Sequence, residues 1–258
     1  MSLLRIAVLL LIVTGCRVES ITQVQMTSNH AATVVVELGF DHEALTFMGE
    51  QGQSPLEVIT EVAGQIDPEG LGVDPARVQR SLVNEDGIEK VRIEIESVTL
   101  DELGGLVTGS GSILGELELT ASQPGFTLLG STRPLSEAER ARLRTSPTDL
   151  GEVFALHFRF FPPGPVLEHN ADRVTPEGGL EWNLLPAVVE DRQVILQASF
   201  EAGPGPTTPF GSASQPASVP LPAGNSQADD SPWWVVVVPS LVTAALVVGL
   251  IRRARARR

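Results

Sequence analysis

The sequence predicts an α+β fold: a mostly antiparallel, curved sheet with two or three helices on one face, followed by a single C-terminal transmembrane helix. Three observations support this prediction. Apolar and polar residues alternate along several segments, helix-capping residues precede apolar stretches, and an uncharged stretch near the end is followed by arginines. Clean alternation indicates strands with one buried and one solvated face, which is typical of antiparallel sheets.

The alternation has a period of two residues, as in half-buried strands. Apolar side chains share one face in segments 34–40, 91–95, 117–119, 154–160, 180–184 and 194–200. In the fourth segment, for example, Phe158 and Phe160 face away from His157 and Arg159. These segments are therefore predicted to be strands, and another strand pattern begins near residues 17–23.

Helix starts are marked by capping residues. Ser54-Pro55-Leu56-Glu57 is a capping box with proline at the first helical position. Asp74-Pro75 repeats this device, and Ser136-Glu137-Ala138-Glu139 predicts a short, charged helix through Arg144. Asp41-His42-Glu43, directly after a strand, is interpreted as a solvated turn.

The N-terminus carries features of a bacterial lipoprotein signal. Arg5 precedes an apolar run that is too short to span a membrane, and Val13-Thr14-Gly15-Cys16 fits a lipobox. An ordinary signal peptide with an incidental cysteine is the alternative. Because Cys16 is the only cysteine and stands at the required position, we expect it to be lipidated. A lone cysteine also excludes an internal disulfide.

The C-terminus carries features of a membrane span. Trp233 to Ile251 contains no charge, and its 19 residues cover about 29 Å as a helix, the thickness of the hydrocarbon core. Trp233 and Trp234 suit the outer interface, whereas Arg252, Arg253 and the arginines that follow suit the cytoplasmic side. A buried core helix would not explain this polycationic tail.

Composition divides the chain into five parts. They are a signal peptide at 1–15, an acidic extracytoplasmic domain at 16–201, a flexible Pro/Gly/Ser-rich tether at 202–231, a transmembrane helix at 232–251 and a cytoplasmic basic tail at 252–258. The predicted location is the cell membrane, with a single pass and a lipid anchor at Cys16.

Net charge argues against nucleic-acid binding. The chain carries −14 overall, but the part between the end segments holds all 32 acids and 12 basic residues, a net charge of −20. Such a surface repels phosphate backbones. No nucleic-acid partner is therefore expected. The two anchors imply the membrane bilayer as a partner, and the protein partners are left open.

Catalytic and cofactor motifs are missing from the sequence. The Gly-rich stretch 109–115 does not have the spacing of a nucleotide-binding loop, and no Gly-x-Ser-x-Gly elbow occurs. The Glu94/Glu96 pair lies on one strand face and is interpreted as solvated, while His157 and His169 have no recognisable partner. We therefore predict no enzyme activity, no cofactor, no metal site and no catalytic residue.

One stretch resembles a known family. The turn of Pro163, Gly164 and Val166, then Asn170 and the strand with Trp182, resembles the late hairpin of the LppM-type lipoproteins of actinobacteria. Those proteins also share the plan of lipobox, α+β ectodomain, tether, transmembrane helix and basic tail. The five residues are interpreted as structural markers: the turn residues supply the bend, Asn170 bonds its own backbone, and Trp182 contributes core area.

The resemblance implies a surface lipoprotein that handles envelope lipids or glycolipids. Together with the missing catalytic motifs, this favours a non-enzymatic domain that binds a lipid or glycolipid between the sheet and the helices. The alternative is a protein-interaction module that scaffolds a cell-envelope complex, and an enzyme is the third possibility.

Overall fold

The computed structural model describes residues 17–28, 30–48, 54–64, 73–108, 112–122, 125–144, 150–203 and 219–220. The predicted signal peptide, Cys16, the transmembrane segment 232–251 and the basic tail 252–258 lie outside the described residues, as does most of the tether. Among the helices of the described ranges, none combines the length and the apolar character needed to cross a membrane.

Eight strands form the larger sheet, here called sheet A. Its order is β12-β3-β4-β2-β1-β7-β10-β9, and only β1 and β7 run parallel among the described neighbours. The strands are β1 (Val18–Met26), β2 (Ala31–Asp41), β3 (Val78–Glu85), β4 (Ile88–Thr99), β7 (Phe154–Phe161), β9 (Arg173–Val174), β10 (Leu180–Asn183) and β12 (Val219–Pro220).

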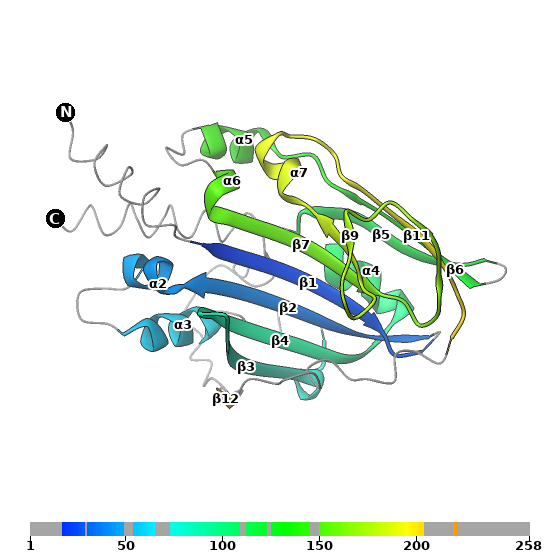
Figure 1. Ribbon diagram of the computed structural model, residues 1–258, viewed down its shortest axis with the longest axis horizontal. Helices are drawn as coiled ribbons and strands as arrows, with labels where there is room; N and C mark the ends of the chain where they lie inside the picture. The colour runs from blue at the N-terminus through cyan, green and yellow to red at the C-terminus, as the bar shows by residue number, and fades with distance from the viewer. Residues whose placement is uncertain are drawn as a thin grey trace.

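Four antiparallel strands form a second sheet, sheet B, which lies behind sheet A in Figure 1. They are β5 (Leu114–Ala121), β6 (Gly125–Thr132), β11 (Ile195–Glu201) and β8 (Val166–His169), in spatial order. The prediction of a strand-rich, mostly antiparallel α+β fold is confirmed, but the prediction of one sheet is wrong. Alternation along a strand reports which face is buried and does not report which strands pair.

Short helices connect the strands. They are α2 (His42–Met48), α3 (Pro55–Gly64), the 3-10 helix η2 (Pro75–Arg77), α4 (Leu100–Thr108), α5 (Glu137–Arg144), α6 (Leu150–Val153) and α7 (Leu185–Val189). The predicted capping boxes are confirmed in α3 and α5. The Ser54 N–H donates to Glu57 over 2.6 Å, and the Ser136 N–H donates to Glu139 over 2.7 Å.

One local prediction is confirmed in part and another is wrong. Asp74 is a cap with proline in the first helical turn, as predicted, but it starts only the single 3-10 turn η2, because the chain enters β3 at Val78 and is held there by pairing with β4. Asp41-His42-Glu43 is not a solvated turn, because Asp41 ends β2 and caps α2. Its Oδ1 accepts the Ala44 N–H over 2.7 Å, which satisfies one of the free donors of the first helical turn.

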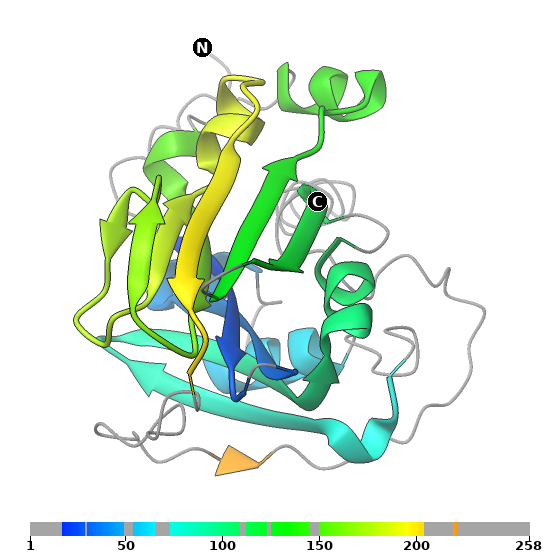
Figure 2. The same ribbon diagram turned by 90° about the vertical axis from the view of Figure 1, so that its right-hand side faces the viewer.

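The hydrophobic core lies between the two sheets. It joins the inner face of sheet A to sheet B and to side chains of α2, α3 and α4, such as Leu45, Ile59 and Leu103. Phe200 of β11 contacts Phe160 of sheet A with ring centroids 5.3 Å apart, and Phe126 of β6 at 5.9 Å. Aromatic side chains therefore fill the space where the two sheets meet. Figure 2 shows the two sheets from the side.

Candidate functional site

The inner face of sheet A is incompletely covered at its centre. Thr22 of β1 and Val36 and Leu38 of β2 face the interior but are only partly buried. Their neighbours along β2 on the same face, Val34 and Phe40, are 1% and 2% exposed. We call Thr22, Val36 and Leu38 the inner-face centre.

The position of the helices accounts for this partial exposure. α2 follows directly from β2 at Asp41, at one end of sheet A. α4 follows β4 after Thr99, which pairs with Ala31 at the opposite end. Helices thus pack near the two ends of the central strands, and the inner-face centre lies between those ends.

A buried hydroxyl adjoins the inner-face centre. Ser20 lies on the same face of β1 as Thr22 and pairs with Leu38 across the strand boundary. Its side chain is buried, and its Oγ has no hydrogen-bond partner among the described residues. A buried hydroxyl without a partner costs about 1–3 kcal/mol. The site therefore combines apolar side chains with one free polar group.

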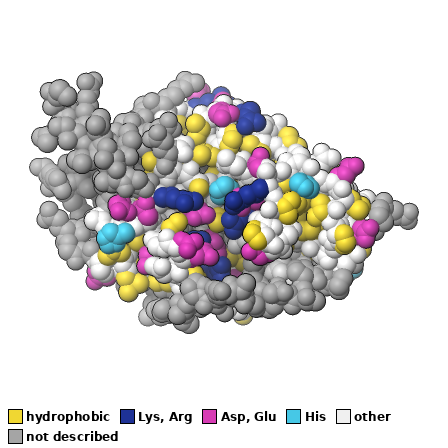
Figure 3. Space-filling view, in the orientation of Figure 1, with side chains coloured by type: hydrophobic (Ala, Val, Ile, Leu, Met, Phe, Trp, Pro, Cys, Tyr) yellow, Lys and Arg dark blue, Asp and Glu magenta, His cyan; other side chains and the backbone are white. Residues whose placement is uncertain are grey.

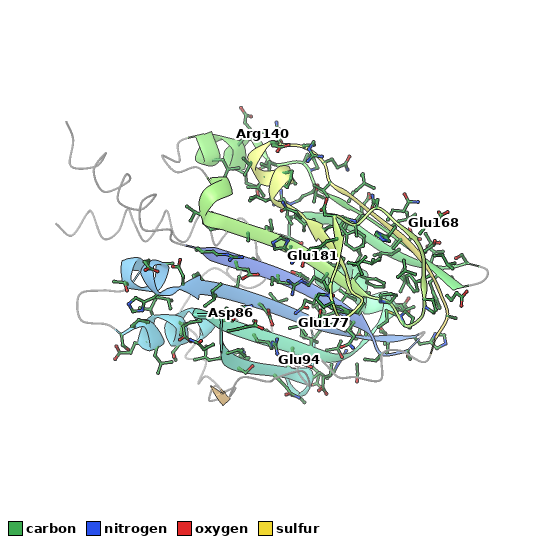
Figure 4. All side chains as sticks on the ribbon, in the orientation of Figure 1. Asp86, Glu94, Arg140, Glu168, Glu177 and Glu181 are labelled. Carbon is green, nitrogen blue, oxygen red and sulfur yellow. The ribbon has the colours of Figure 1, made fainter. Side chains whose placement is uncertain are left out.

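The outer face of sheet A carries a row of ion pairs. Glu181 of β10 lies 2.6 Å from Arg173 and 2.5 Å from Arg159, measured between carboxylate oxygens and guanidinium Nε atoms. Glu37 of β2 is paired in the same way with Arg92 of β4. Figure 3 shows these opposite charges gathered on one face, and Figure 4 labels Glu181. We call these residues, with His157, Lys90 and Glu85, the outer row.

Lys90 of β4 and His157 of β7 lie within the outer row. The Lys90 ammonium lies 2.7 Å from Glu85 and 3.8 Å from Glu37. His157 Nδ1 lies 3.3 Å from Glu181, but without the geometry of a hydrogen bond, so we describe the two as neighbours rather than as a bonded pair. The sequence predicted no recognisable partner for His157. In the structure, it lies next to Glu181 and the arginines that pair with Glu181.

Burial and charge act in opposite directions on Glu181. Burial tends to raise its pKa, but hydrogen bonds from Arg173 and Arg159 and their positive charges outweigh that effect, and the pKa lies below its ordinary value. For His157, burial is the largest influence and lowers the pKa below 6.5. The imidazole is therefore neutral at pH 7, while Glu181 is ionised.

We expect His157 to weaken the fold upon acidification. Since its folded-state pKa is lowered, the unfolded chain binds a proton more readily as the pH falls below about 6.5. The charged groups that face it are Glu181, Arg159, Glu19 and Arg173. Urea unfolding at pH 7 and pH 5 should show that His157→Gln loses less stability than the wild type over this interval. An equal loss in both proteins would contradict this origin.

The five residues of the resemblance gather around β11. Gly164 packs against the backbone of Glu201, where an added Cβ would overlap the carbonyl oxygen, and Val166 pairs with Phe200. Trp182 is 1% exposed. The structure thus brings Pro163, Gly164, Val166, Asn170 and Trp182 into one region that joins the two sheets. Trp182 pairs with Phe158, which in turn pairs with Thr22 of the inner-face centre.

The prediction that Asn170 bonds its own backbone is wrong. Its Oδ1 accepts the Trp182 Nε1–H and the Gln197 N–H, each over 2.8 Å, and its Nδ2 donates to the Ile195 carbonyl over 2.9 Å. Asn170 therefore connects β11 to β10, which belong to different sheets.

Replacing Asn170 with alanine is expected to lower the free energy of unfolding by about 2 kcal/mol, because three groups lose their partner at once. Urea titration followed by tryptophan fluorescence would measure this loss. A neighbouring exposed side chain provides the control, and Glu168→Ala should change stability by less than about 0.5 kcal/mol. Similar losses in both variants would show that the hydrogen bonds of Asn170 contribute little to the stability of the fold.

The other acidic and histidine residues that the sequence analysis considered do not form a common site. Glu94 is partly buried, which raises its pKa, and Glu96 is bonded to Gln79. His169 accepts the N–H of Ala171. Within the described ranges, no three His, Cys, Asp or Glu side chains are grouped so as to hold a metal ion.

The fold and these two faces define a two-layered α+β domain with a polar outer face and a partly open apolar inner face. No family model and no curated protein matches the chain. Among solved structures, the folded domain of LppM from Mycobacterium tuberculosis is similar, with a TM-score of 0.41 and 16% identity. The match covers 73% of this chain and 92% of that domain. It is a distant likeness of fold.

Proposed function

We propose that this chain is a non-enzymatic lipoprotein of the cell envelope that binds a lipid or glycolipid at the inner-face centre of sheet A. Its membrane anchors are the lipidated Cys16 and the helix 232–251. The observation that carries the proposal is the partial exposure of Val36 and Leu38 in the middle of a central strand, next to the unpartnered hydroxyl of Ser20.

Two kinds of group at the inner-face centre favour a bound lipid. Apolar surface left in water costs about 25 cal/mol for each Å² that a ligand could cover. The Ser20 hydroxyl adds the cost of an unmade hydrogen bond. An acyl chain with an ester or hydroxyl oxygen near its end would remove both costs, because it offers apolar contact and a polar atom together.

The junction between the two sheets is a less suitable place for a ligand than the inner-face centre. The region where sheet A meets sheet B is filled by Phe160, Phe200 and Phe126. A lipid bound there would have to displace buried aromatic side chains, each of which contributes several kcal/mol to the core. The inner-face centre requires no such displacement of these rings.

Lipid binding is tested by native mass spectrometry of the full chain. The protein would be extracted from membranes, transferred to a mild volatile detergent and measured with its associated lipids. A stoichiometric adduct of envelope lipid mass is expected. A folded protein that is repeatedly free of adducts, including after incubation with total envelope lipid, would contradict the proposed function.

The anchors are tested separately. Cells that make the wild-type chain should incorporate labelled fatty acid into it, and Cys16→Ala should abolish the label. Since the predicted helix 232–251 remains, Cys16→Ala is expected to stay in the membrane fraction. Release of this variant into the medium would show that residues 232–251 do not anchor the chain.

The outer row favours a second candidate function, a scaffold for a cell-envelope complex. No described helix packs on this face in Figure 1, and Arg173 is 61% exposed on its side chain. A charged face of this kind suits a polar protein partner. If Arg173→Glu abolished the assembly of an envelope complex and left the lipid adducts unchanged, the scaffold function would be favoured over lipid binding.

A further inference from the structure

The chain enters and leaves the domain at opposite ends of sheet A. It enters at Arg17, whose carbonyl accepts the N–H of Asp41 over 3.0 Å next to the start of β1. β7 runs parallel to β1 and ends at Phe161, level with Gln25. Beyond that end, Gly203 packs against Pro163 and Gly164. The tether therefore begins about 25 Å from Arg17, the length of β1.

The tether then returns to sheet A. Val219 and Pro220 form β12, which pairs antiparallel with Leu82 and Ser81 of β3. Across the sheet, Leu82 is level with Val91, Leu38 and Ser20. This level lies only two residues from the start of β1, so β12 pairs much closer to the entry end than to the exit end. Figure 2 shows the short strand β12 beside β3.

Strand pairing at this edge has a clear physical basis. Without β12, β3 would be the last strand of sheet A on that side, and its outward N–H and C=O groups would have no strand partner. An extended peptide can satisfy such an edge through main-chain hydrogen bonds, with little demand on its side chains. Proline is tolerated on an edge strand, although it donates no hydrogen bond and so favours a short pairing.

We propose that the edge of β3 is a docking site for the C-terminal tether, which closes as a clip at Val219–Pro220 and shortens the link to the membrane. With the clip closed, the free link is 221–231 instead of 202–231. For flexible chains, the r.m.s. reach falls from roughly 30 Å to roughly 18 Å. Both anchors then hold the Arg17 end of the domain near the bilayer; this consequence rests on the proposed membrane anchoring, whereas the clip does not.

The clip is tested by a disulfide in the full chain, solubilised in detergent so that neither membrane nor lipid is required. Ser81→Cys with Pro220→Cys places two thiols at directly opposed positions, within the range of a disulfide. In Glu85→Cys with Pro220→Cys, the control, the first thiol is four residues along β3, roughly 13 Å away and out of range. Mass spectrometry of proteolytic fragments would report the bond.

We expect an intramolecular disulfide in the matched pair at a yield roughly tenfold above the control, as a fixed local concentration implies. Equal yields in the two pairs would overturn the proposal, because an undocked tether would sample both positions. A disulfide formed only between two chains would also overturn the proposal. It would indicate that the edge of β3 binds the tether of a second copy of the protein. The bond is also expected to form when Cys16→Ala is added, so that failure of the membrane anchoring is distinguishable from failure of the clip.

Discussion

Replacing Glu181 with alanine is expected to lower the free energy of unfolding by about 3 kcal/mol. The carboxylate is almost fully buried on the outer face of sheet A and neutralises Arg159 and Arg173. Its removal leaves two guanidinium groups close together without their shared counter-ion. The loss lies at the lower end of the range for buried ion pairs, because Arg173 remains largely exposed to water.

Glu177→Ala provides a matched control for Glu181. It removes the same charge from an exposed position in the loop before β10, labelled in Figure 4. This variant should change stability by less than about 0.5 kcal/mol. Urea unfolding at pH 7 would compare the two. If both variants lost the same stability, the effect would come from the change in net charge. The ion pairs of the outer row would then contribute nothing to the stability of the fold.

Replacing Phe200 with alanine is expected to cost about 4 kcal/mol, the largest effect of a single substitution that we predict. Its ring is fully buried and contacts Phe160 of sheet A and Phe126 of sheet B. Truncation leaves a cavity at the junction of the two layers, and the surrounding strands cannot collapse into it without changing their register.

A second residue of the same strand controls for the effect of truncation itself. Ile195 lies on β11 but is 48% exposed, so Ile195→Ala should cost less than about 1 kcal/mol. Thermal unfolding of both variants would show whether the loss follows burial. A small loss for Phe200→Ala would mean that the two sheets are not joined through this aromatic cluster.

Much of the fold could be predicted because local patterns determine local structure. Alternation in 34–40 and 154–160 identified β2 and β7, and the Ser54 capping box identified α3. One available signal was overlooked. Thr99 and Glu102 form a capping box of the same kind, in which the Thr99 N–H donates to Glu102 over 2.9 Å, and it starts α4. Arg77 and the same cap hold the Glu102 pKa at about 2.

The arrangement of strands could not be predicted from these patterns. β1 pairs in parallel with β7, although more than 120 residues separate them, and no local signal reports such a pairing. The outer row depends on the same pairings, since it joins Glu181 to Arg159 and Glu37 to Arg92. Each of these residues alternates with apolar residues of its strand, but its ion-pair partner lies on another strand and is visible only in the sheet.

The inner-face centre was hidden for a similar reason. Val36 and Leu38 share one face of the predicted strand with Val34 and Phe40, so the sequence predicts equal burial for all four. Their burial differs because α2 and α4 lie near opposite ends of the sheet, and this depends on where β2 and β4 end. Ser20 gave no signal, because a serine in a strand is ordinarily solvated or bonded.

Lipid occupancy of Leu38→Gln, compared with Leu129→Gln, tests the proposed function most directly. Both leucines are replaced by the same polar side chain, but Leu129 is exposed on sheet B, away from the inner-face centre. A further variant, Val36→Thr, keeps nearly the same side-chain shape but places a hydroxyl in the apolar site. Circular dichroism would establish that each variant is folded before lipid adducts are measured by native mass spectrometry.

The account predicts that Leu38→Gln lowers lipid affinity by roughly tenfold or more, since a leucine contact with an acyl chain contributes about 1.5 kcal/mol or more. Val36→Thr should lower it by a smaller factor, and Leu129→Gln should leave it unchanged. Undiminished lipid occupancy in folded Leu38→Gln and Val36→Thr, or an equal decrease in Leu129→Gln, would contradict a ligand site at the inner-face centre.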